Sequence, residues 1–238
     1  MQDKGMEIRI LVPRFGNINE RKNRLHEVVR LSGITIPVGE EDKPLTIKVA
    51  SIPSARLQVY FIDNEDYFLR KSVFTDKDDN FYADNDERAI FFCKGVLETV
   101  KKLGWSPDIV HCSDWMSSLI PLYLKTTYKN DPMFKDAKSI FTVFDSEFSH
   151  KFKFEGLYDK IKLLDIEDEM LTQIDSADYE GFLKIGIEYS DSVTTATENL
   201  LEKYNHIFNA FPDKKIQYIA TDENFEDNTY KLYQDTLD

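Results

Sequence analysis

Polar and aromatic side chains follow one short apolar run of the sequence, at the point where a strand would end. His111, Ser113 and Asp114 lie at and just after the run 108–112, and Trp115 opens an amphipathic segment. In an open parallel sheet, the turn from a strand to the next helix faces the crevice where ligands bind. There these groups could contact a polar ligand, and the indole could stack on a ring of that ligand. The simpler alternatives are a hydrogen-bonded core histidine, a helix cap made by Ser113 or Asp114, and an indole packed in the core.

A second polar group, Asp84, Asn85, Glu87 and Arg88, precedes an apolar stripe with helical spacing. Asp84 has the position of an N-cap and Glu87 stands three residues later, which is the pattern of a capping box. Arg88 lies one turn into the predicted helix and could pair with Asp84 or Glu87 as a surface contact of little energetic value. The stripe predicts a core-facing helix that ends near Gly104.

The rest of the chain supplies the elements that must position these two groups. Runs rich in β-branched and aromatic residues predict strands, and after residue 104 strands alternate with helices, which indicates a parallel sheet with helices on both faces. We therefore expect an α/β fold with a Rossmann-like parallel sheet, a single domain over residues 1–238 and a β-rich insertion near residues 24–62. The predicted strands are 7–12, 25–31, 34–38, 45–52, 56–62, 108–112, 139–144, 192–195 and 215–220. Predicted helices include 115–128, 198–208 and 229–236, with two or three more before residue 189.

The composition excludes several classes of partner. With 43 acidic and 30 basic side chains, the chain carries a formal charge of −13. Nucleic acid and anionic membranes both need a basic face on the protein, so neither is expected to bind. No segment reaches the apolar length of a membrane span, and residues 1–5 do not open a secretory signal. Cys93 and Cys112 are expected to be buried thiols of a cytoplasmic protein, and no metal site or other cofactor is predicted.

Five segments carry, in order along the chain, the motifs of one known family. They are 5–16 (GMEIRILVPRFG), 59–64 (VYFIDN), the Asp84-Asn85 pair with Arg88, 107–115 (PDIVHCSDW) and 183–195 (LKIGIEYSDSVTT). These segments resemble the N-terminal, acceptor-side catalytic domain of bacterial glycogen and starch synthases. Members of that family are ADP-glucose-dependent retaining glucosyltransferases with the two-domain GT-B fold. The resemblance implies one half of a GT-B fold, and it extends to about Thr195.

The resemblance also implies site residues. The catalytic candidates are Asp84, His111 and Asp114. The substrate-binding candidates are Asn85, Arg88, Ser113, Trp115 and Asp145. In the family the residue at Asp84 lies close to the donor glucose, and His111 matches the first histidine of a His-x-His-Asp-Trp motif. No metal ligand is implied.

The same segments depart from the family pattern. Ser113 stands where the second motif histidine would be, and Phe144-Asp145 replaces a His-Asn pair after the next strand. The nine glycines include no closely spaced pair, so the family's Gly-Gly loop for the nucleotide phosphates is not found. We expect the first βα unit and the C-terminal donor domain to be absent, and the carboxylates of Asp145 and Glu147 to repel a diphosphate. One lost donor to a developing charge typically costs about 10²–10³ in rate.

Two functions remain open. The first is transfer of glucose from ADP-glucose to an α-1,4-glucan, by a domain that is inactive as an isolated chain and works with a partner chain or as a fragment of a longer protein. The second is a non-catalytic module of glycogen metabolism that binds glucan or a partner enzyme. An α-glucan is the expected ligand, and ADP-glucose is expected only if a donor domain is supplied. A Rossmann-like protein with an unrelated ligand is a remote third alternative.

Overall fold

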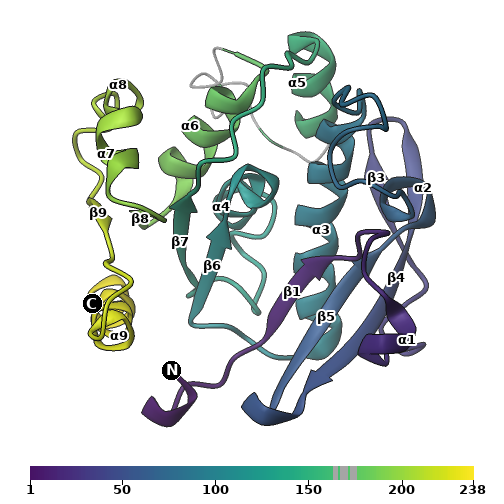
Figure 1. Cartoon of the computed structure of the whole chain (residues 1–238), viewed down its shortest axis with the longest axis horizontal. Coiled ribbons are helices and arrows are strands. Elements are labelled where there is room, and N and C mark those ends of the chain that lie inside the picture. Colours follow the sequence, from purple (N-terminus) through teal and green to yellow (C-terminus); the bar gives the residue numbers. More distant parts are fainter. Residues whose placement is uncertain (163–165, 167–170, 172–175) are drawn as a thin grey trace. The chain divides into compact units, whose positions relative to one another are not determined.

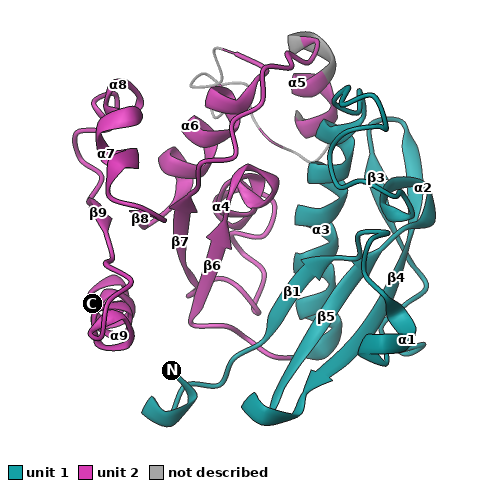
Figure 2. Cartoon of the chain, viewed as in Figure 1, with its two compact units in different colours: residues 1–104 teal, residues 105–238 magenta. Residues whose placement is uncertain are grey.

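The computed structural model describes residues 1–162, 166, 171 and 176–238 (Figure 1). The chain divides into two compact units, unit 1 with residues 1–104 and unit 2 with residues 105–238 (Figure 2). Each unit is built on its own sheet. The expectation that the whole chain forms one domain stays a prediction.

The sheet of unit 1 has five strands. β1 (Ile10–Pro13) runs parallel to β5 (Leu57–Asp63), and β5 is antiparallel to β4 (Glu41–Ile52). β2 (His26–Glu27) and β3 (Ile34–Val38) both pair with β4 in antiparallel orientation. The β-rich region expected near residues 24–62 therefore forms β2 to β5, and it is continuous with the first strand of the chain.

One strand prediction in unit 1 is wrong for most of its length. Residues 25–31 were expected to form a strand, but only β2 pairs with β4, and the chain then turns. The amides of Leu31 and Ser32 both donate to the carbonyl of Val28, which closes the turn. The Ser32 hydroxyl accepts from the amide of Ile47 at 2.9 Å. A side chain thus satisfies a backbone group of β4 that a longer β2 would have bonded.

Helix α3 (Asn85–Leu103) is the long helix of unit 1 and packs on β3, β4 and β5. It ends at Gly104, which adopts the left-handed conformation (φ 66°) as predicted. Lys94 is buried within this helix and its ammonium group donates to the carbonyl of Pro37 in β3 at 2.6 Å. The short helices of unit 1 are η1 (Gln2–Lys4), α1 (Glu20–Asn23), η2 (Pro53–Ala55) and α2 (Glu65–Phe68).

The sheet of unit 2 is parallel throughout, as the alternation of strands and helices predicted. Its order is β6 (Ile109–Ser113), β7 (Lys138–Val143), β8 (Ser192–Thr195) and β9 (Ile216–Tyr218). The helices that the structure describes are η3 (Trp115–Ser117), α4 (Leu119–Lys125), α5 (Phe154–Lys162), α6 (Tyr179–Tyr189), α7 (Asn199–Lys203), α8 (Asn205–Phe208) and α9 (Phe225–Leu237). The predicted helices 115–128 and 198–208 are each divided in two. Of the helices expected before residue 189, α5 and α6 are described, and part of the span between them lies outside the described residues.

Helices cover both faces of this parallel sheet. Successive residues of a strand point to opposite faces. The ring of Phe141 in β7 lies against Gly186 of α6. The next residue, Thr142, bonds His111, which in turn bonds Tyr233 of α9. Helices α6 and α9 therefore pack on opposite faces, which confirms the Rossmann-like layer arrangement.

The close approach of α6 to β7 depends on the absence of a side chain at Gly186. A Cβ atom there would lie 2.7 Å from the ring of Phe141, which is fully buried. We expect Gly186→Ala to destabilise the protein by about 1–3 kcal/mol through overpacking, although alanine is otherwise the better helix former by about 1 kcal/mol. Urea denaturation would measure this, and adding Phe141→Leu should restore most of the loss. A Gly186→Ala protein as stable as the parent would contradict the packing argument.

Candidate functional site

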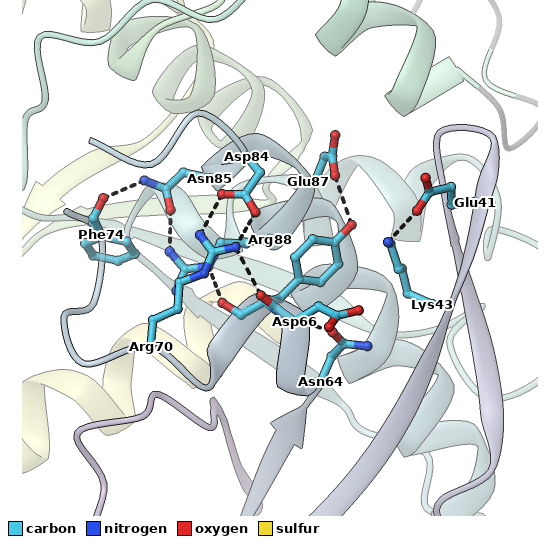
Figure 3. A network of polar contacts seen from close by, with 11 residues as sticks. Glu41, Lys43, Asn64, Asp66, Arg70, Phe74, Asp84, Asn85, Glu87 and Arg88 are labelled. Atoms are coloured by element: carbon cyan, nitrogen blue, oxygen red, sulfur yellow. Dashed lines mark hydrogen bonds and ion pairs between the residues drawn. The ribbon is translucent and has the colours of Figure 1, made fainter. Parts of the chain in front are cut away.

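The polar group of unit 1 gathers around the start of α3 (Figure 3). Asp84 holds the N-cap position, but its carboxylate makes no capping hydrogen bond. Both oxygens instead accept from the guanidinium of Arg70, with Nη1 to Oδ1 at 2.8 Å and Nη2 to Oδ2 at 2.5 Å. The carboxylate of Glu87 accepts from the hydroxyl of Tyr67 at 3.0 Å. The capping box predicted from the sequence is therefore wrong, because the carboxylate of Asp84 bonds Arg70 and not the backbone of α3.

Arg88 is fully buried, so the surface contact expected for it is wrong. Its Nε donates to the carbonyl of Tyr67 at 2.8 Å, and its Nη1 donates to the side chain of Asn85. Asn85 in turn donates to the carbonyl of Phe74 at 2.9 Å. The guanidinium carbon lies 5.4–6.0 Å from the centres of four aromatic rings. These rings belong to Phe15, Phe68, Phe74 and Tyr82.

Burial and charge act differently on the ionisable groups of this cluster. Burial, and then the positive charge of Arg70, lower the pKa of Arg88 to about 10. Burial alone would raise the pKa of Asp84, but the hydrogen bonds and charge of Arg70, with the charge of Arg88, outweigh it and leave that pKa below its usual value. Near neutral pH the cluster therefore presents an ionised carboxylate, held in one orientation, which can accept hydrogen bonds from hydroxyl groups of a ligand.

The polar group of unit 2 lies at the carboxyl ends of β6 and β7. Asp114 follows β6 and accepts from the amide of Trp115 at 2.7 Å and from the hydroxyl of Ser146, so its expected capping role is confirmed. Its backbone has φ 69° and ψ 168°, a conformation that is almost confined to glycine. Burial raises the pKa of its carboxyl group, although both hydrogen bonds act in the opposite direction. Ser113 is exposed beside it, at the end of β6.

His111 makes hydrogen bonds through both ring nitrogens. Nδ1 lies 2.9 Å from the hydroxyl of Tyr233, and Nε2 lies 2.7 Å from the hydroxyl of Thr142, which is itself 2.7 Å from the hydroxyl of Thr194. The residue as a whole is exposed, but its ring nitrogens are enclosed by protein groups, and this desolvation lowers its pKa to about 4. The imidazole is therefore neutral at physiological pH. This geometry supports the hydrogen-bonded interpretation of His111, and a catalytic role for it stays a prediction.

The two remaining candidates of unit 2 lie in different surroundings. Trp115 is 1% exposed and packs edge-on against Phe148 and Phe182, with ring centres 5.1 and 5.6 Å away. Its indole is thus part of the core, and contact with a sugar stays a prediction. Asp145 is exposed and accepts from the ammonium group of Lys203 in α7 at 2.6 Å. Lys203 also lies 3.1 Å from the carboxylate of Glu147.

The structure therefore sorts the predicted site residues into two groups. Asp84, Asn85 and Arg88 lie together in unit 1, and His111, Ser113, Asp114, Trp115 and Asp145 lie in unit 2. Sequence reasoning missed the residues whose side chains hold these groups, among them Arg70, Thr142, Ser146, Lys203 and Tyr233. No motif marks them, because each reaches its partner only after folding. Among the residues that the structure describes, no set of three or more His, Cys, Asp and Glu side chains could hold a metal ion.

Comparison with known proteins gives consistent results. The sequence model described as starch synthase catalytic domain matches residues 1–208. Glycogen synthase of Chlorobium luteolum is 38% identical over 229 residues, which are 94% of this chain and 45% of that protein. Glycogen synthase of Chlorobium phaeobacteroides is 40% identical over 201 residues, 83% of this chain and 40% of that protein. The chain thus spans less than half the length of these relatives.

A solved structure also has a similar fold. It is the catalytic domain of starch synthase IV from Arabidopsis thaliana bound to ADP and acarbose. The TM-score is 0.69 at 19% sequence identity, and the match covers 91% of this chain and 45% of that chain. The likeness confirms the fold class, one half of a GT-B arrangement.

The environment of His111 leads to a prediction about pH. The unfolded chain takes up a proton on this histidine near its ordinary pKa of about 6.5, whereas the folded chain resists protonation until about pH 4. Its contribution to stability is therefore present above pH 6.5 and is lost as the pH falls toward 4. We expect the melting temperature to fall more between pH 7 and 4.5 in the parent than in His111→Gln. His26→Gln, at an exposed histidine, serves as the control and should follow the parent.

The backbone of Asp114 leads to a second prediction. In its conformation a Cβ atom is strained by about 1–3 kcal/mol, and glycine is not. We therefore expect Asp114→Gly to be more stable than Asp114→Ala by about that amount, although both variants lose the same carboxylate. The usual order is the reverse, since glycine has the larger entropy cost. Denaturation curves of the two variants measure this difference in stability. An alanine variant at least as stable as the glycine variant would show that the turn is unstrained.

Proposed function

The chain belongs to the starch synthase catalytic domain family, and from that membership we propose that it is the acceptor-side domain of a glycogen or starch synthase that binds an α-1,4-glucan. The observation that carries the proposal is the family match over residues 1–208, which includes the segments that hold Asp84 and Asp114. Hydrogen-bonding carboxylates of this kind suit the hydroxyl groups of a neutral polysaccharide. The proposed reaction is transfer of glucose from ADP-glucose to the glucan, with the donor held by a domain beyond this chain.

We further propose that the isolated chain does not transfer glucose. Ser113 and Phe144 stand where the family pattern has histidines, and neither can exchange a proton near neutral pH as an imidazole does. The same substitutions favour a second candidate function, a non-catalytic module that binds glucan or a partner enzyme. The two functions differ in one respect, since only the first gives transfer when a donor domain is supplied.

The cysteines of the chain agree with a cytoplasmic setting, which forms part of the proposal. Cys93 and Cys112 are both buried thiols, as in proteins of reducing compartments. None of the described helices combines the length and apolar character that a membrane crossing requires. The formal charge of −13 supports our exclusion of nucleic acid and anionic membranes as partners.

Calorimetric titration with maltoheptaose tests the proposed ligand. We expect saturable heat with the parent chain, and about tenfold weaker binding for Asp84→Asn and Asp114→Asn, which corresponds to about 1.4 kcal/mol. Asp213→Asn, at an exposed aspartate, is the matched control and should bind like the parent. A folded sample that gives no heat would contradict glucan binding.

A transfer assay with ADP-glucose and glycogen tests the reaction. We expect no transfer by the chain alone, and transfer by the isolated chain would contradict the proposed inactivity. Recovery of transfer after a relative's donor domain is added would favour the half-enzyme over the non-catalytic module. Binding that is never accompanied by transfer would favour the module.

A further inference from the structure

Two sets of donors compete for the carboxylate of Asp84. The first turn of α3 has backbone N–H groups that an N-cap side chain normally accepts. The other donor is Arg70, which takes both carboxylate oxygens. Asp84 makes no capping bond, so the guanidinium has turned the carboxylate away from the helix. The side chains of Arg70 and Asp84 remain 25% and 30% exposed, which leaves the pair accessible to a ligand.

Arg70 is held in place independently of Asp84. Its Nη2 donates to the carbonyl of Asp66 at 3.0 Å, and its guanidinium carbon lies 4.6 Å from the centre of the Tyr82 ring. Its backbone amide donates to the carbonyl of Phe68 at 2.8 Å. At Gly16 the chain passes so close that a Cβ atom would lie 2.2 Å from the Arg70 carbonyl oxygen. Backbone and side chain are thus both fixed before the carboxylate binds.

Arg88 does not orient the carboxylate of Asp84 through hydrogen bonds. Two of its nitrogens are already bonded to the carbonyl of Tyr67 and the side chain of Asn85, and the side chain is buried among aromatic rings. It acts on Asp84 through its charge alone. A single planar fork, that of Arg70, therefore determines where the carboxylate points.

We propose that Arg70 is the positioning residue of the unit 1 site, whose paired hydrogen bonds fix the orientation of the Asp84 carboxylate for contact with ligand hydroxyl groups. The inference rests on the proposed function only in treating Asp84 as a ligand-contacting residue. Lysine cannot replace Arg70 fully, because an ammonium group is a point charge and does not hold both oxygens in one plane.

The test is a carboxyl-carbon NMR titration of protein labelled with ¹³C-aspartate, in which Asp84→Asn identifies the Asp84 signal. We expect the pKa of Asp84 to rise by about one unit or more in Arg70→Gln. Burial raises this pKa, and the hydrogen bonds and charge of Arg70 would no longer oppose that effect. Arg70→Lys keeps the charge and should give a smaller rise. Arg30→Lys, at an exposed arginine of the same unit, should leave the signal unchanged. If Arg70→Gln does not fold, the pKa of Asp84 is measured in Arg70→Lys instead. An unchanged Asp84 pKa in the folded Arg70 variant overturns the proposal.

Maltoheptaose binding by the same variants separates this proposal from the proposed function. If Arg70 acts through Asp84, Arg70→Gln and Asp84→Asn should each weaken binding about tenfold, and the double variant should be no weaker than either. Additive losses would mean that Arg70 acts by another route and would overturn the positioning role. If the parent binds no glucan but the Asp84 pKa rises as expected, the positioning role stands and the proposed function fails.

Discussion

The arrangement of unit 1 depends on a cation that has no carboxylate bonded to it. Arg88 is fully buried, and an ionised group in such a place is tolerated only when hydrogen bonds replace its lost hydration. The carbonyl of Tyr67 and the side chain of Asn85 provide those bonds, and Asn85 also holds the carbonyl of Phe74. Nη2 of the same guanidinium is buried without a hydrogen-bond partner, so the group is only partly satisfied. Its two bonded nitrogens join α2, the segment after it and the start of α3. The Arg70–Asp84 pair is attached to this framework.

In unit 2, buried polar atoms are satisfied by hydrogen bonds between neutral side chains. The hydroxyls of Thr142 and Thr194 lie inside a parallel sheet, where an unbonded polar atom would be costly. A chain of hydrogen bonds runs from Tyr233 through His111 to these two threonines and so connects α9 to three adjacent strands. Because the imidazole is neutral, one ring nitrogen donates and the other accepts. This polar chain stabilises the sheet face, whereas the strained Asp114 is at the sheet's carboxyl edge, where ligands bind in such folds.

The exact bounds of some strands follow from local sequence alone. The strands 34–38 and 192–195 were predicted to the residue, because runs of β-branched residues bounded by glycine or polar residues need no information from elsewhere. The partners of the site residues could not be predicted in this way. Arg70 and Asp84 are 14 residues apart, Asp145 and Lys203 are 58 apart, and His111 and Tyr233 are 122 apart. The capping box failed for the same reason, since a distant guanidinium competed successfully with a local bond.

The charge at the carboxyl edge of the unit 2 sheet also differs from the charge expected from the sequence alone. Asp145 and Glu147 were expected to repel a diphosphate, but Lys203 contacts both carboxylates and neutralises part of their charge. Asp114 adds a third acid whose ionisation burial opposes. Lys203 does not balance the charge of all these acids, so this edge still favours a ligand without negative charge. A neutral glucan meets that condition better than a nucleotide diphosphate, which is consistent with the ligand proposed above.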